Sequence, residues 1–211
     1  MTHYQAPLSA SLVAKWFVRR AEAAHATDLD NMKLQKLLFL SHSRYMHDHG
    51  RPLVRERVEA WKHGPVIDVV YQEYKSYGSS CIHQSLAENG PWVRLPDDVV
   101  GALENVWESF GVLSGWALRE LTHEIGPWQS FYDSRSLHTE IPITAIGSAW
   151  PLFKTHAADR GPEAAALRRL EELRRRAAAR SLPDMKTNTE ALRQAYESWS
   201  ESRTEATTLL S

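Results

Sequence analysis

Apolar residues recur at three- and four-residue steps along most of the chain, a spacing that predicts a mainly α fold. The first helix is predicted over about residues 9–24, with Ser9 or Ser11 as its N-cap. A second helix is predicted over about 31–49, where a leucine-rich stripe ends at Gly50, a residue suited to a left-handed C-cap. Both helices are expected to bury one face in a common core.

A Gly-Pro pair, Gly64 and Pro65, is read as the start of a third helix that ends near Gly78. Proline suits the first helical position because its fixed φ is helical and its missing N–H would be unpaired there in any case. Trp61 and His63 would then stand before the N-terminal amides of this helix, which favour a carboxylate. This junction is a candidate site; alternatively, the two side chains only fix the path of the chain into the helix.

The remaining predicted elements are short. A small β-hairpin is predicted over about residues 80–95, because two stretches with apolar residues flank a polar turn. Further helices are predicted to open near Pro96, Ser114, Gly126 and Pro142, and Pro151 is expected to kink or stop the last of them near Trp150.

The composition changes near residue 159, so we predict a globular domain over residues 1–158 and a helical C-terminal extension over 159–211. Residues 160–180 carry seven arginines and three glutamates, whereas 184–211 carry three basic and five acidic residues. This complementary charge favours a helical hairpin within the extension, although a partly disordered final helix fits the same composition.

The composition is that of an ordinary soluble globular chain. Of the 211 residues, 43% are hydrophobic and 24% are charged, and the net charge of −1 gives no global field that would attract nucleic acid or a membrane. Cys81 is the only cysteine, and no apolar run approaches the ~20 residues of a membrane span, so a reducing, cytoplasmic location is expected. Eight tryptophans suit a binding protein, because tryptophan is enriched among interface anchors.

The sequence offers no recognisable catalytic or metal-binding motif. It holds no glycine-rich phosphate loop and no nucleophile elbow. His42, His47 and His49 lack the four-residue spacing that places two zinc ligands on one helix face. We therefore expect no cofactor, no metal and no catalytic residue, and an enzyme centred on His63 and His123 is the weakest alternative.

Two further groups of polar residues stand beside predicted core positions. Lys33 and Lys36 are either solvated lysines along the leucine stripe or a basic edge that meets an acidic partner or joins the first Gly-Pro junction. Thr122 and His123 stand before a second Gly-Pro pair, Gly126-Pro127, so the two junctions are candidates to converge on one pocket. In the alternative interpretation, their polar groups only satisfy buried backbone ends.

Three separated motifs together resemble the Panacea (SocA-like) antitoxin domain family over about residues 8–155. They are Met-Lys-Leu-Gln-Lys-Leu-Leu-Phe at 32–39, Glu-Ala-Trp-Lys-His-Gly-Pro-Val at 59–66 with Tyr71, and Leu-Thr-His at 121–123 with Pro127 and Trp128. The residues that match signature positions, and that we take as candidates for partner binding, are Lys36, Trp61, His63, Gly64, Pro65, Tyr71, Thr122, His123 and Trp128.

The resemblance implies a mainly helical antitoxin that neutralises a cognate protein toxin by direct binding. Some members of the family act as proteolytic adaptors, and many are associated with phages or prophages. We expect the tryptophan-rich face and the two Gly-Pro junctions to form a groove for a toxin segment, in a homo- or hetero-oligomer. The main alternative is a DNA-binding regulator or a proteolytic adaptor that uses the arginine-rich segment from Arg168 to Arg180.

Overall fold

A computed structural model of the chain describes residues 6–83, 94–136 and 138–159. The arginine-rich segment and almost all of the predicted extension at 159–211 lie outside these residues. The predicted hairpin at 80–95 also falls mostly outside them, and residues 81–83 form no strand.

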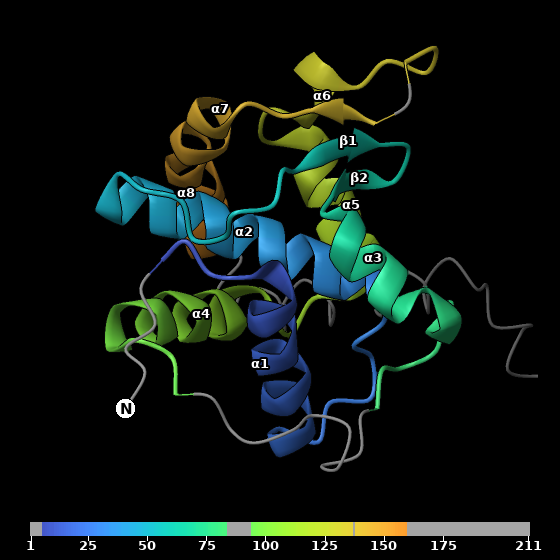
Figure 1. The fold of residues 1–211 in the computed structure, drawn as a ribbon, viewed down its shortest axis with the longest axis vertical. Coiled ribbons are helices and arrows are strands. Elements are labelled where there is room, and N and C mark those ends of the chain that lie inside the picture. The colour runs from blue at the N-terminus through green and yellow to red at the C-terminus, as the bar shows by residue number, and fades with distance from the viewer. Residues whose placement is uncertain (1–5, 84–93, 137, 160–211) are drawn as a thin grey trace, which may run out of the picture. The chain divides into compact units, whose positions relative to one another are not determined.

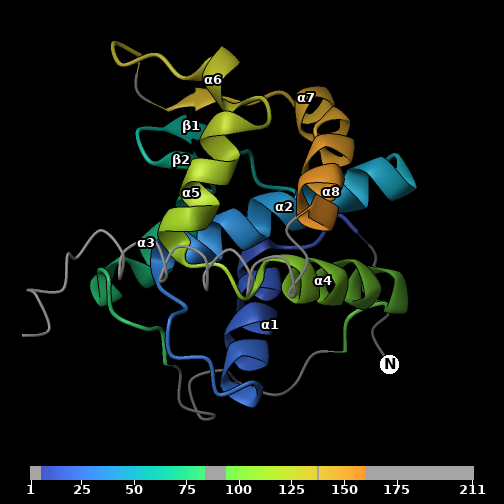
Figure 2. The same cartoon turned by 180° about the vertical axis from the view of Figure 1, so that it is seen from behind.

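One long helix, α2 (Asn31–His49), runs through the middle of the described domain in both opposite views (Figures 1 and 2). Eleven consecutive residues of α2, from Lys33 to Ser43, are buried, because other helices surround it. The helices packed against it are α1 (Ala10–Ala23), α3 (Asp68–Tyr74), α4 (Asp97–Phe110), α5 (Gly115–Glu124), α7 (Ile143–Ser148) and α8 (Trp150–Asp159). The prediction of a mainly α fold is confirmed.

Several predicted helix ends are confirmed, because their caps are local in sequence. The Asp30 carboxylate accepts a hydrogen bond from the backbone N–H of Lys33 at 2.7 Å, and Gly50 closes α2 with φ +64°. Ser114 caps α5 by accepting from the N–H of Ala117. Ser9 does occupy the N-cap position of α1, but its side chain makes no capping bond.

The predicted helix start at Gly64-Pro65 is wrong. Residues Glu59–Trp61 form strand β1 and Gly64–Val66 form strand β2, and the two pair as an antiparallel hairpin. Strand β3 (Thr139–Glu140), which the sequence did not predict, pairs with the other edge of β1, so the strand order is β2-β1-β3. Pro65 is tolerated because β2 is an edge strand, where a missing N–H breaks no ladder bond. The helix α3 begins only at Asp68, and a short 3₁₀ turn, η1 (Lys75–Tyr77), follows it.

The predicted start of a short helix after Gly126-Pro127 is confirmed by α6 (Trp128–Phe131). The expected stop near Trp150 is also confirmed, since α7 ends at Ser148. Pro151 then occupies the first turn of α8, where its missing N–H would have no helical partner.

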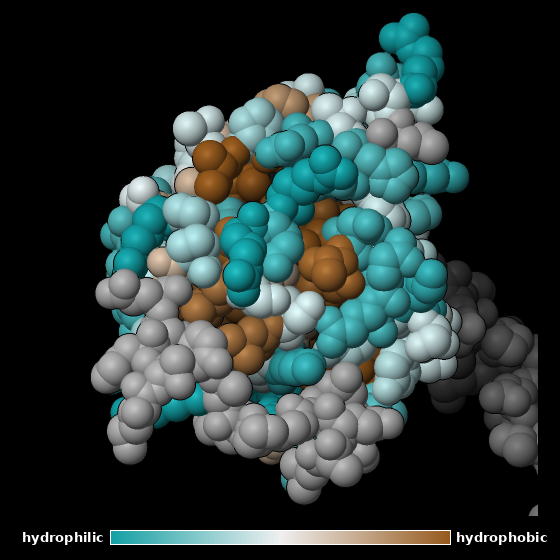
Figure 3. All heavy atoms as spheres, in the orientation of Figure 1, coloured by the Kyte–Doolittle hydropathy of each residue, from teal (hydrophilic) through white to brown (hydrophobic). Residues whose placement is uncertain are grey.

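The apolar surface of the described residues is scattered. Large exposed apolar side chains come from different elements, and the face drawn in Figure 3 shows separate hydrophobic patches divided by hydrophilic residues. The exposed side chains are Val69, Val112, Trp116, Ile143 and Leu152. Among the described helices, none combines the length and the apolar character that crossing a membrane requires.

Candidate functional site

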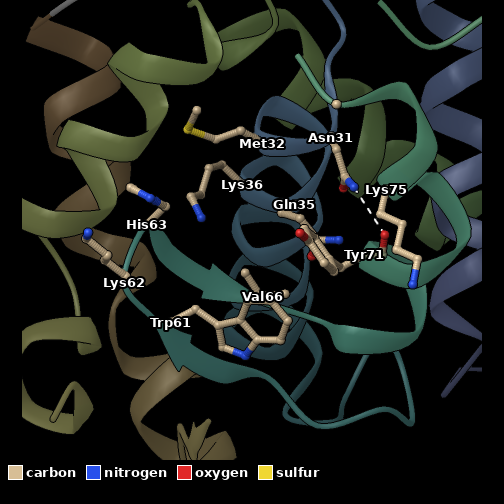
Figure 4. A pocket seen from close by; sticks show the side chains of 11 residues that line it. Asn31, Met32, Gln35, Lys36, Trp61, Lys62, His63, Val66, Tyr71 and Lys75 are labelled. Atoms are coloured by element: carbon tan, nitrogen blue, oxygen red, sulfur yellow. Dashed lines mark hydrogen bonds between the residues drawn. The ribbon is translucent and has the colours of Figure 1, made fainter. Parts of the chain in front are cut away.

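An open pocket of about 240 Å³ lies between α2, the β1–β2 hairpin and α3 (Figure 4). The residues that line it are aromatic, aliphatic, amide-bearing or basic, and no aspartate or glutamate is among them. They are Asn31, Met32, Gln35, Lys36, Trp61, Lys62, His63, Val66, Tyr71, Lys75 and Gly78.

Two amide side chains on α2 connect this helix to the opposite wall of the pocket. The Gln35 Oε1 atom accepts a hydrogen bond from the N–H of Ile67 at 2.8 Å, and the Asn31 Nδ2 atom donates to the carbonyl of Tyr71 at 3.2 Å. These bonds fix which way each amide points. The remaining atoms, Gln35 Nε2 and Asn31 Oδ1, are buried without a hydrogen-bond partner among the described residues.

Lys36 is buried in the same region, with only 1% of its surface exposed. Its Nζ atom donates to the carbonyl of Pro65 at 2.9 Å, so α2 is joined directly to strand β2. Burial, followed by the charge of Arg119, lowers the pKa of Lys36 to about 7, while Asp30 acts in the opposite direction.

Lys33 is also buried, but its Nζ atom contacts the Asp28 carboxylate at 2.8 Å and the carbonyl of Gly111 at 2.7 Å. The interpretation of Lys33 and Lys36 as solvated lysines is therefore wrong. The alternative is confirmed for Lys36, which joins the first Gly-Pro junction.

Gly64 lets β2 approach both α2 and α5. A Cβ atom placed there would lie 2.6 Å from Lys36 Nζ and 3.2 Å from Thr122 Oγ1, and Gly64 has φ +102°. Only glycine adopts this conformation without strain. Thr122 is fully buried on α5 and donates its hydroxyl to the carbonyl of Arg119 at 3.0 Å. The two junctions predicted from the sequence therefore do meet in space.

Trp61 forms one wall of the pocket and is held by a buried carboxylate. Its indole Nε1 donates to Glu59 Oε2 at 2.8 Å, and the Glu59 carboxylate also contacts His138 at 2.9 Å and Arg57 at 2.7 Å. The Trp61 ring makes edge contacts with His138 and with Tyr71, at centroid distances of 4.4 and 4.9 Å. This packing restricts the rotamers of Trp61.

The second junction supports the hairpin instead of lining the pocket. The Trp128 indole donates to the carbonyl of Trp61 at 2.8 Å, and its ring stacks between His123 and Tyr132 at 3.6 and 4.7 Å. Burial, followed by the charges of Arg119 and Lys36, lowers the pKa of His123 to about 4, so this imidazole is neutral at pH 7. His123 and Thr122 are absent from the pocket lining, so the predicted single pocket contains only the first junction.

The pKa of His63 is lowered as well, first by burial and then by Arg119, Lys62 and Lys36. The charge of Arg119 thus lowers the pKa of Lys36, His63 and His123 alike. A positive potential of this kind, which Asp30 and Glu120 offset only in part, suits the binding of an anionic group. In the described part of the chain, no three His, Cys, Asp or Glu side chains are grouped as metal ligands.

Sequence reasoning missed four residues that shape the site: Asn31, Gln35, Glu59 and His138. Gln35 and Glu59 lie inside the quoted motifs, so the motifs could have identified both residues as site candidates. His138 carries no such signal, because only the pairing of β3 with β1 brings it to Glu59.

Replacing Trp128 with phenylalanine is expected to destabilise the fold by about 1–3 kcal/mol, because the carbonyl of Trp61 loses its donor and part of the ring is lost. Urea unfolding measures this change. Trp116→Phe is the matched control, since Trp116 is 59% exposed, and it should shift the free energy of unfolding by no more than about 0.5 kcal/mol. Equal effects of the two substitutions would contradict the proposed support of the hairpin by Trp128.

Comparisons with known proteins identify the family of this chain. A family profile described as "Antitoxin SocA-like, Panacea domain" matches residues 34–129, a range that includes all nine candidate residues from Lys36 to Trp128. The antitoxin SocA of Caulobacter vibrioides (strain NA1000 / CB15N) is 33% identical over 130 residues, which cover 57% of this chain and 69% of that relative. No solved structure matches significantly. The chain belongs to the SocA-like Panacea family of antitoxin domains.

Proposed function

We propose that this protein is an antitoxin that neutralises one cognate protein toxin by binding it directly. The observation that carries the proposal is the grouping of four signature residues, Lys36, Trp61, His63 and Tyr71, around one open pocket. The toxin is held there without chemical modification, in a hetero-oligomer with this chain.

The composition of the pocket supports binding to a protein. Aromatic residues carry much of the affinity of protein interfaces, and here Trp61 and Tyr71 are in contact beside basic side chains. The contacts of Trp61 with Glu59 and His138 restrict its motion before any partner arrives. Such preorganisation lowers the entropic cost of association.

The other signature residues have a supporting role in this proposal. Pro65 accepts the Lys36 hydrogen bond, and Gly64 and Thr122 allow the close approach of β2 to its neighbours. Trp128, stacked on His123, holds the carbonyl of Trp61. They position the pocket and need not contact the toxin themselves.

Co-expression with the product of the adjacent open reading frame tests the proposal. That product alone should arrest growth, and this protein should restore growth and copurify with it. The proposal fails if the neighbouring product is harmless alone or stays toxic in the presence of this protein.

Trp61→Ala should weaken binding of the toxin about 30-fold or more, as expected for a central aromatic anchor. Isothermal titration calorimetry measures this loss, and circular dichroism verifies that the variant is folded. Trp116→Ala is the matched control, because Trp116 is an exposed tryptophan of α5 outside the pocket, and it should bind nearly as tightly as the wild type. Comparable losses in the two variants would place the contact surface elsewhere.

A further inference from the structure

The two buried lysines of α2 differ in one respect. Lys33 has a counter-ion, the carboxylate of Asp28 at 2.8 Å. Lys36 forms no ion pair with a carboxylate of the described residues, and its Nζ atom donates to a neutral carbonyl at 2.9 Å. Asp30 is the acidic group that acts on Lys36, but its carboxylate accepts the N–H of Lys33 and caps the helix. A buried ammonium without a close counter-ion is unfavourable unless something else offsets it.

The groups around Lys36 add to this imbalance. Arg119 approaches from α5, where it forms an ion pair with Glu120. Lys62 and His63 line the pocket from the turn of the hairpin. Lys75 lines the same pocket from η1, and His123 on α5 is neutral. The pocket therefore presents several basic groups and no acidic lining residue to an incoming ligand.

Gln35, another lining residue of the pocket, carries a hydrogen-bond donor that has no partner among the described residues. Gln35 is 2% exposed and lines the pocket, and its Oε1 atom is engaged by the N–H of Ile67. Its Nε2 atom is left without a partner among the described residues. Unsatisfied buried donors are uncommon in native proteins and call for an acceptor.

The size and the walls of the pocket narrow the class of ligand. A volume of about 240 Å³ is smaller than the ~300–1,000 Å³ typical of pockets for drug-sized molecules. Met32, Val66, Trp61 and Tyr71 give it apolar walls. Of its basic side chains, Lys36 is buried and the others are exposed. An acidic side chain, with an aliphatic stem and a terminal carboxylate, matches both features.

We propose that the pocket receives an aspartate or glutamate side chain of the toxin, whose carboxylate supplies the counter-ion that Lys36 lacks. This inference rests on the proposed function, because it assumes that the toxin binds this chain directly. Figure 4 shows Lys36 and Gln35 projecting from α2 toward the hairpin that carries Trp61 and Val66. The carboxylate would lie among these side chains, with its stem against the aromatic wall.

Proton uptake follows from this arrangement. The pKa of Lys36 is about 7 in the free protein, mainly because of burial, and a carboxylate beside it would raise that pKa. At pH 8, Lys36 is mostly neutral before binding and becomes protonated in the complex. The toxin should therefore bind with uptake of a proton at pH 8, and its affinity should fall as the pH rises from 7 to 9.

Calorimetric titration of the full-length protein with the toxin tests the inference, in two buffers of different ionisation enthalpy. The wild type should show proton uptake at pH 8. Lys36→Met should weaken binding about 30-fold or more at pH 6.5 and should abolish the uptake. Lys15→Met, which removes a charge from α1 away from the pocket, should stay within about threefold of the wild type.

The source of the carboxylate is tested on the toxin by replacing each acidic residue with its amide. One such substitution should reproduce the loss seen with Lys36→Met, and combining the two should add little. If the wild type does not bind the toxin, the proposed function fails and this inference fails with it. If the wild type binds but Lys36→Met binds equally well, or no acidic residue of the toxin couples to Lys36, the inference alone is overturned.

Discussion

Lys36→Met is expected to make the free protein more stable, by about 1–3 kcal/mol at pH 6. Lowering the pKa of Lys36 from 10.5 to about 7 corresponds to about 5 kcal/mol against the charged form in the folded state. Methionine has a similar length and no charge. Part of the gain is offset, since the carbonyl of Pro65 loses the hydrogen bond from Nζ.

The stabilisation of the free protein by Lys36→Met should decrease as the pH rises. Below pH 7, Lys36 is protonated in both the folded and the unfolded state, and the full cost of burying the charge is present. Between pH 7 and about 10, the unfolded state binds more protons at this position, so the wild type becomes relatively more stable as pH rises. The advantage of Lys36→Met should therefore shrink from pH 6 to pH 9, as measured by urea unfolding at both values.

Lys33→Met is the matched control, because it removes a lysine of equal burial from the same helix. It should destabilise the protein, since the Asp28 carboxylate and the Gly111 carbonyl both lose their donor. If Lys33→Met lowers the free energy of unfolding and Lys36→Met raises it, Lys33 stabilises the fold, whereas Lys36 is retained for binding. Destabilisation by Lys36→Met at pH 6 would contradict this distinction.

Gly64→Ala is expected to destabilise the fold by about 2–5 kcal/mol, through backbone strain and overpacking. With φ +102°, an alanine at this position is strained whatever space surrounds it. Its Cβ atom would also lie 2.7 Å from Lys36 Cε and 2.6 Å from Nζ. The lysine is buried and donates a hydrogen bond to the carbonyl of Pro65. Moving it away from the alanine Cβ would break this hydrogen bond between α2 and β2.

Gly101→Ala provides the comparison for Gly64→Ala in urea unfolding. Gly101 lies within α4, and a Cβ atom there would meet nothing within 4 Å. Alanine should stabilise that helix by about 0.5–1 kcal/mol because glycine is the poorer helix former. If both substitutions changed stability in the same direction and by a similar amount, the close packing at Gly64 would not be the cause.

The helices could be predicted from the sequence wherever their ends are set by nearby residues. Asp30 and Gly50 bound α2 through interactions that span only a few residues, and Ser114 caps α5 in the same way. The predicted helix start at Gly64-Pro65 was wrong because distant residues set the conformation of this pair. Strand β1 lies between Gly64–Val66 and residues 139–140, and no local pattern discloses that pairing.

The candidate site could likewise be predicted only in part, because some of its contacts join residues that are distant in sequence. Signature positions identified Lys36, Trp61, His63 and Tyr71, which do line one pocket. The burial of Lys36 could not be predicted, since it depends on how closely Gly64 brings β2 toward α2. The hydrogen bond from Trp128 to the carbonyl of Trp61 was equally hidden, because 67 residues separate its partners.

This last hydrogen bond has a consequence for the newly made chain. A ribosome adds about 5–20 residues per second, so Trp61 is synthesised about 3–13 seconds before Trp128 exists to hold its carbonyl. During that interval the hairpin can pair and Lys36 can reach Pro65, because those residues are already present. The wall of the pocket is therefore completed late in synthesis, and a chain cut short before Trp128 would contain every residue that lines the pocket but not the indole that supports it.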